Sequence, residues 1–300
     1  MSNPPLSGAL PRISLMIIGA QKAGTTSMKN YLGQHPSLQT HPHKEFSYFF
    51  DPTDHAQGYA HAYKKYFQSV SPEVALVAKN AGLYTSEEGI KRLKEHNPDC
   101  KLIFILRNPV DRSYSSYLME KNYGAVNGTF DMLEHLVRHP DESNWQYNFF
   151  IEMGLYSKYL SMIYKYFPKE QVKLIRYEDL NRSSVETCRS IFKWLNIDDS
   201  FQPDTSTRFN VTHVNRSPFY GRFIVQLLRN QNPVKKIVRN FMPGKMDYKV
   251  GEMLRNLNKT SRTYDAISPK MEELLTDFYT PHNNKLSELT GMDFSDWNKF

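Results

Sequence analysis

The chain has 300 residues, a net charge of +7, 23% charged residues and 13% aromatic residues. This composition excludes disorder over most of the length and allows one large α/β domain or two small ones, each with a sizeable core. The positive charge is typical of proteins that meet anionic partners such as nucleotides, acidic glycans, nucleic acid or membrane surfaces, and does not choose among them.

The first predicted unit is a strand, a loop and a helix. Residues 1–12 hold three prolines without periodicity and are expected to form a loose leader. Residues 13–18 form a short apolar run that ends at a glycine, as buried parallel strands do before a loop. Apolar residues at helical spacing then predict a helix over residues 25–34, which stops before Pro36.

The later elements repeat this alternation. Further apolar runs predict strands at 74–78, 101–106 and 172–175. The helices expected are 86–97 with Ser86 as its cap, one through 113–119 with Pro109 in its first turn, 155–167, 219–229, and 268–289, which opens with Ser268 and Pro269. Short strands alternating with helices predict a parallel sheet covered on both faces, a three-layer α/β fold. We expect one domain over residues 13–297, with a helical C-terminal part.

The cysteines and the hydropathy predict a soluble, cytoplasmic chain. Cys100 and Cys188 are too few for a disulfide framework and lack metal-ligand spacing, so both are expected to be buried. No apolar run reaches the roughly 18 residues that a membrane-spanning helix needs. Contact with a membrane is therefore expected at its surface or not at all.

Residues 18–27 have the pattern of a phosphate-binding loop with a displaced lysine. Gly19 and Gly24 keep the glycine spacing of the nucleotide-binding sequence G-x-x-x-x-G-K-[ST], but Thr25 stands where the lysine belongs. The cation has moved inside the loop, to Lys22. Backbone N–H groups at the start of the next helix could still hold a 5′ phosphate. This arrangement favours transfer of a group other than the γ-phosphoryl of ATP.

A second anion site is predicted at the end of the 101–106 strand. Arg107 follows that strand, and Ser115 lies about two turns into the next helix, so a guanidinium and a hydroxyl can face one anion. Ligands of open parallel sheets bind at the carboxyl ends of the strands. Two phosphate sites without metal ligands between them predict a nucleoside with 5′ and 3′ phosphates, such as adenosine 3′,5′-bisphosphate.

These motifs resemble the donor-binding motifs of sulfotransferases. Gly19-Ala-Gln-Lys-Ala-Gly-Thr-Thr26 is similar to their 5′-phosphosulfate loop, and Arg107 with Ser115 to their 3′-phosphate motif. The resemblance is closest to the heparan-sulfate type and continues in order through residues 44–50, 79–84, 154–156, 177–180, 262–263 and 278–283. It implies a P-loop NTPase-like fold, 3′-phosphoadenosine 5′-phosphosulfate as sulfonate donor, no metal, and an acceptor hydroxyl on a carbohydrate or glycolipid.

The resemblance also implies roles for individual residues. Lys22 would stabilise the charge that develops on the bridging oxygen, Glu45 would be the general base, and Lys79 would neutralise the transferring sulfonate. The implied donor-binding residues are Lys22, Ala23, Gly24, Thr25, Thr26, Ser27, Arg107, Ser115, Thr260, Ser261 and Arg262. The family has Lys-Gly-Arg where this chain has Thr260-Ser-Arg262, so the arginine carries over and the lysine does not.

Several alternatives stay open at this point. His41, His43 and His55 are other candidate bases, because related small-molecule sulfotransferases use histidine. Residues 229–249 hold six basic residues and one acid, and could bind an anionic acceptor or a membrane surface, or form a solvated face.

A P-loop kinase is the nearest rival function, although no aspartate ends a predicted strand to hold Mg²⁺. A non-catalytic polyanion-binding protein is another. Nucleic acid is not an expected partner, and the sequence does not specify the acceptor or the oligomeric state.

Overall fold

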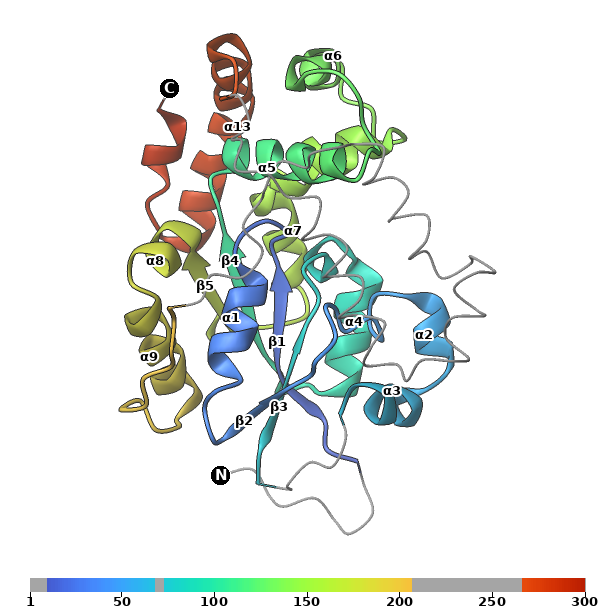
Figure 1. Ribbon diagram of the computed structural model, residues 1–300, viewed down its shortest axis with the longest axis vertical. Coiled ribbons are helices and arrows are strands. Elements are labelled where there is room, and N and C mark those ends of the chain that lie inside the picture. The colour runs from blue at the N-terminus through green and yellow to red at the C-terminus, as the bar shows by residue number, and fades with distance from the viewer. Residues whose placement is uncertain (1–9, 68–72, 207–265, 300) are drawn as a thin grey trace.

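The computed structural model describes residues 10–67, 73–206 and 266–299 of the chain. Its centre is a sheet of five parallel strands in the order β2-β3-β1-β4-β5 (Figure 1). The strands are β1 (Ile13–Gly19), β2 (Leu38–Thr40), β3 (Ala75–Lys79), β4 (Lys101–Leu106) and β5 (Val172–Arg176). The predicted parallel α/β sheet is therefore confirmed.

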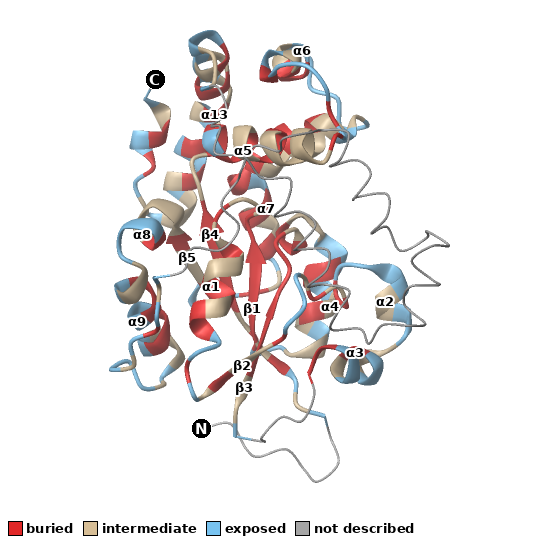
Figure 2. Cartoon of the chain, in the orientation of Figure 1, coloured by how far each residue is buried: buried red, intermediate tan, exposed pale blue. Residues whose placement is uncertain are grey.

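Four of the five strands match the apolar runs of the sequence to within one residue at each end. They are recognisable because β1, β3 and β4 are buried almost throughout (Figure 2). The sequence analysis missed β2, which is three residues long and pairs only with β3 at the edge of the sheet. A strand this short has no measurable periodicity.

Helices connect the strands and cover the sheet. The described helices are α1 (Thr25–Leu32), α2 (Pro52–Ala56), α3 (Tyr59–Tyr66), α4 (Glu87–His96), α5 (Pro109–Asn122), α6 (Glu134–Arg138), α7 (Tyr156–Ile163), α8 (Tyr177–Arg182), α9 (Ser184–Leu195) and α13 (Pro269–Thr290). Right-handed crossovers place α1, which leads from β1 toward β2, and α4, which leads from β3 back to β4, on opposite faces. α1 contacts α9, and α4 contacts α7.

The predicted caps are confirmed at two helices. The Ser86 side chain accepts from the Gly89 N–H at the start of α4, and the Ser268 side chain accepts from the Met271 N–H at the start of α13. α1 ends two residues earlier than predicted, at Leu32, and Gly33 is its C-cap residue. The predicted helix 219–229 and the basic residues 229–249 lie outside the described residues.

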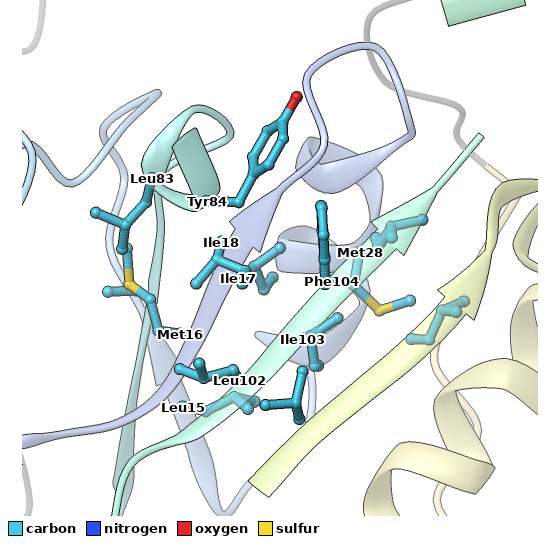
Figure 3. Packing of buried hydrophobic residues seen from close by; sticks show 14 of the residues in the cluster. Leu15, Met16, Ile17, Ile18, Met28, Leu83, Tyr84, Leu102, Ile103 and Phe104 are labelled. Carbon is cyan, nitrogen blue, oxygen red and sulfur yellow. The ribbon is translucent and has the colours of Figure 1, made fainter. Parts of the chain in front are cut away.

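The buried apolar residues form two clusters. The larger cluster fills both faces of the sheet, and Figure 3 shows part of it, with side chains of β1, β4, α1 and the turn Leu83–Thr85 packed together. The smaller cluster lies among α5, α6, α13 and the π-helical turn Tyr147–Ile151. Cys100 and Cys188 are buried thiols, as predicted. Within the described ranges, no helix is both long enough and apolar enough to cross a membrane.

The strand order decides where a ligand can bind. Because β1 lies between β3 and β4, the residues that follow these three parallel strands meet at the carboxyl ends of the strands. The chain leaves β1 toward one side of the sheet and leaves β4 toward the other, and in open parallel sheets ligands bind at such a switch point.

Candidate functional site

The loop after β1 is held tightly between its neighbours. At Gly19 a Cβ atom would collide with the Tyr84 ring, so only glycine allows this close approach. The Ala20 N–H donates to the carbonyl of Ile105 in β4 over 2.7 Å, which ties the loop to the neighbouring strand. Gly24 has φ +79°, a left-handed conformation that glycine adopts without strain. The two glycines recognised in the sequence thus have separate steric roles.

This loop delivers the chain to the start of α1. Gly24 is the N-cap, and no side chain caps the helix. An uncapped helix start carries backbone N–H donors and the positive end of the helix dipole, both of which favour an anion. Thr25 is buried there, whereas Thr26 and Ser27 are partly exposed. The predicted phosphate-binding residues are therefore together at one helix terminus.

Lys22 lies in the same loop with φ 72°. Its carbonyl accepts a hydrogen bond of 3.0 Å from Nη1 of Arg107. Burial, followed by the nearby charges of Lys44 and Arg107, lowers the pKa of Lys22 from 10.5 to about 8. A bound anion would stabilise the charged ammonium and raise the pKa of Lys22 again.

Arg107 follows β4, as predicted, and its guanidinium is fixed from several sides. The guanidinium lies over the Tyr177 ring, 4.8 Å from the ring centroid, and its Nη2 lies 4.0 Å from Oδ2 of Asp111. The Tyr156 hydroxyl fixes the main chain, because it donates to the Arg107 carbonyl over 3.0 Å. The Nε of Arg107 is buried and has no hydrogen-bond partner among the described atoms. Ser115 is partly exposed on α5. A buried donor without a partner is costly, and a bound phosphate would satisfy it.

Glu45 and Lys79 form an ion pair beside the phosphate loop. Lys79 ends β3, and its Nζ lies 2.8 Å from Oε1 of Glu45 and 3.4 Å from Oγ1 of Thr26. The other carboxylate oxygen of Glu45 accepts from the Ala81 N–H over 3.0 Å. The Lys79 side chain is 1% exposed and the Glu45 side chain 32%. Burial lowers the pKa of Lys79, and Glu45 partly offsets that effect. The pair therefore combines a buried ammonium with an oriented carboxylate that is partly exposed to solvent.

The three histidines considered as bases have other surroundings. His41 is buried among Phe46, Tyr66 and Phe67, and burial lowers its pKa to about 2. The His43 ring makes a hydrogen bond of 3.2 Å to the Lys65 carbonyl. His55 packs on Tyr48. The contacts described for these rings involve neither Lys79 nor the loop after β1.

Two charged residues near the loop were missed by the sequence analysis. Glu120 on α5 feels the charges of Lys22 and Lys44, although burial raises its pKa overall. Lys29, in α1, is buried and holds the chain segment that precedes Glu45. Neither belongs to a recognisable motif, because each reaches the site through the fold. Tyr177 lay in a segment quoted for the resemblance, but its place beneath Arg107 could not be inferred.

Three predicted donor-binding residues, Thr260, Ser261 and Arg262, lie outside the described residues. Within the part of the chain that the structure describes, no group of three or more His, Cys, Asp or Glu side chains is arranged to hold a metal ion.

Comparisons with known proteins bear on the family of this chain. Residues 12–256 match the family model described as the sulfotransferase domain. Heparan sulfate glucosamine 3-O-sulfotransferase 5 of Mus musculus is 24% identical over 280 residues, which are 92% of this chain and 71% of that protein.

Two solved structures share the fold. A sulfotransferase from Alicyclobacillus acidocaldarius is similar over 97% of this chain and 100% of its own, with a TM-score of 0.67 and 24% identity. The mouse sulfotransferase SULT7A1 complexed with PAP is similar over 92% of this chain and 86% of its own, with a TM-score of 0.50 and 14% identity.

Proposed function

The chain belongs to the sulfotransferase domain family and is a sulfotransferase, and on that premise we propose its donor, its acceptor class and its catalytic residues. The donor proposed is 3′-phosphoadenosine 5′-phosphosulfate, and the acceptor is a hydroxyl of a carbohydrate or glycolipid. The observation that carries the proposal is the Glu45–Lys79 ion pair beside Thr26 of the phosphate loop.

The donor fits the unsatisfied groups of the site. The uncapped start of α1, with Lys22 and the residues from Ala23 to Ser27, would hold the 5′ phosphosulfate. Arg107, whose buried Nε has no described partner, would hold the 3′ phosphate with Ser115. A role for Arg262, with Thr260 and Ser261, rests on the resemblance alone. Support for a nucleotide with a 3′ phosphate also comes from the mouse sulfotransferase SULT7A1, whose structure is a complex with PAP.

The transfer step uses three side chains in distinct roles. Glu45 accepts the proton of the acceptor hydroxyl as its oxygen forms a bond to sulfur. The bond between sulfur and the bridging oxygen breaks in line, and the electron pair stays with the 5′ phosphate. Lys22 stabilises the negative charge on that leaving oxygen, and Lys79 balances the charge spread over the sulfonate. The product is a sulfate ester together with adenosine 3′,5′-bisphosphate.

A carbohydrate acceptor is proposed from the relatives and from the exposure of the base. The relative from Mus musculus is named for transfer to a glucosamine hydroxyl of heparan sulfate. A sugar hydroxyl is a poor nucleophile at neutral pH and needs a base within hydrogen-bond reach. Glu45 is half-buried and fixed by Lys79 and the Ala81 N–H, so it is accessible and oriented.

The test combines binding with transfer. Calorimetry without magnesium is expected to show binding of adenosine 3′,5′-bisphosphate, and incubation with ³⁵S-labelled donor and a panel of glycans, glycolipids and phenols is expected to label a carbohydrate hydroxyl. Binding of ATP that requires Mg²⁺ would instead support a kinase. Binding of polyanions without either nucleotide would support a non-catalytic protein, and labelling of phenols alone would overturn the acceptor class.

A further inference from the structure

Lys29 is a buried cation in the second turn of α1. It is 5% exposed, and its ammonium donates to the carbonyls of His41 and His43, each over 2.8 Å. Lys29 takes part in none of the ion pairs found among the described residues. Burial, and then the charge of Lys79, lower its pKa from 10.5 to about 8, while Glu45 raises it. A hydrocarbon side chain could fill this space without the cost of desolvating an ammonium.

The two carbonyls belong to the segment on which Glu45 is mounted. β2 ends at Thr40, and residues 41–44 run from there to Glu45 without regular secondary structure. The His41 ring fixes one side of this segment by packing in an aromatic cluster. The Lys29 ammonium fixes the main-chain carbonyls of the same segment. Irregular backbone needs such partners, because its carbonyls have no sheet or helix to accept from.

Beyond Glu45 the chain is fixed by β3. The Phe46 N–H donates to the Lys79 carbonyl over 2.7 Å, and the Ala81 N–H donates to the Glu45 carboxylate. The base is therefore held from both sides, by Lys29 before it and by the end of β3 after it.

Lys29 also connects this segment to the donor site. It lies one helical turn after Thr25, the first residue of α1, so a rigid turn separates it from the helix start that would receive the 5′ phosphate. We propose that Lys29 is a positioning residue that sets the distance between the base Glu45 and the donor bound at the start of α1. The inference rests on the proposed function of that site. Displacement of a reacting group by about 1 Å can cost 10²-fold in rate.

The test replaces the ammonium and keeps the packing. Lys29→Met is expected to lower kcat about tenfold to hundredfold, with the KM for donor and the affinity for adenosine 3′,5′-bisphosphate within about twofold of wild type. Lys29→Arg, which restores a donor to the carbonyls, is expected to recover most of kcat. A methionine variant with wild-type kcat, or one that loses donor affinity and kcat equally, would overturn the inference.

Lys101 offers a matched control. Its ammonium donates to the carbonyl of Trp194 over 2.6 Å. Lys101 lies at the start of β4, whereas the site lies at the carboxyl ends of the strands. Lys101→Met should lose a similar cation–carbonyl contact and leave kcat unchanged. An equal loss of kcat in both variants would indicate a general effect on folding and contradict a positioning role.

Hydrogen exchange separates this inference from the proposed function. In Lys29→Met, the amides of residue 41 and residues 43–46 should exchange faster than in wild type, while amides of β4 should not change. This readout needs no transfer activity, so it decides the inference even if the wild-type chain transfers no sulfonate. Unchanged exchange at residue 41 and residues 43–46 would overturn it. If the methionine variant does not fold, Lys29→Gln, which is neutral but keeps an amide donor, takes its place in both measurements.

Discussion

Lys79 and Arg112 are both buried cations, but the partners of Lys79 include a carboxylate, whereas the described hydrogen-bond partners of Arg112 are neutral. Lys79 faces the carboxylate of Glu45, whose outer part is exposed. Arg112 is 0% exposed and donates to the carbonyls of Phe149 and Phe150 and to Oγ of Ser116. The first cation has a partner that can exchange protons with solvent, whereas the second has partners that cannot.

The surroundings of Arg112 explain its neutral partners. The π-helical turn Tyr147–Ile151 and the residues after it leave carbonyls without helical partners, which need other donors. Arg112 supplies two of these donors, and the hydroxyls of Tyr279 and Tyr84 donate to Ile151 and Met153 over 2.7 Å each. A buried cation paired with a carboxylate open to a ligand is thus a candidate for the transfer step itself, whereas a buried cation bound to carbonyls holds main chain in place.

Loss of the proposed base should have the largest effect. Glu45→Gln keeps the shape and the hydrogen bond from Ala81 but removes the proton acceptor, so kcat is expected to fall about 10²- to 10⁴-fold. Binding of adenosine 3′,5′-bisphosphate and the melting temperature should stay close to wild type. Glu88→Gln, at an exposed carboxylate on α4, is the control and should be fully active. A fully active Glu45→Gln enzyme would move the base to another residue.

Removal of Lys79 should be nearly as severe for the rate and mild for the fold. Lys79→Met places a hydrocarbon in the same buried space and leaves the sulfonate without its counter-charge, so kcat is expected to fall about 10²- to 10³-fold. Urea unfolding should show a small change in the free energy of unfolding, because Glu45 can be solvated. A large loss of stability with an unchanged rate would place Lys79 in the same class as Arg112.

Arg112 should show the reverse pattern. Arg112→Met leaves the carbonyls of Phe149 and Phe150 buried without donors, which is expected to cost about 2–4 kcal/mol of unfolding free energy. The midpoint of urea unfolding measures this loss, and the folded fraction should keep its kcat. Arg112→Lys, which keeps the charge without the planar fork, should lie between the two. If the folded Arg112→Met enzyme were inactive, the comparison would fail.

Lys22 is a partly buried cation of the candidate site, and the pH dependence of donor binding tests its role. Its pKa in the free protein is lowered to about 8, by burial and by Lys44 and Arg107 against an opposing effect of Glu120. The ammonium becomes neutral as pH rises through about 8, and binding of an anion must restore its proton. At pH 9 the affinity for adenosine 3′,5′-bisphosphate is therefore expected to be about tenfold lower than at pH 7. Calorimetry measures the change, and Lys22→Arg should abolish it.

The sequence predicted what depends on local pattern. Apolar runs marked four strands, serine caps marked the starts of α4 and α13, and glycine spacing marked the loop around Lys22. β2 was missed because three residues carry no period. The contact of Glu45 with Lys79 could not be read directly, since 34 residues separate them and the pairing of β2, which precedes Glu45, with β3, which ends at Lys79, brings them together.

Buried cations were the weakest point of sequence reasoning. Lys29 and Arg112 occupy helix positions that face the interior, where charged residues are rarely found. Their partners are main-chain carbonyls of irregular segments, and such carbonyls leave no signature in a sequence. The residues of the motifs were found, whereas the residues that hold them in place were not.

The hydrogen bond from Arg107 to the Lys22 carbonyl has a consequence for nucleotide selection. It would connect the two proposed phosphate subsites, so that a nucleotide would be recognised at both ends at once. ATP and ADP carry no phosphate on the 3′ oxygen and would leave the Nε of Arg107 unsatisfied, at a cost of about 1–3 kcal/mol. ATP and ADP would thus bind more weakly because a hydrogen bond is missing, and not because of a steric clash.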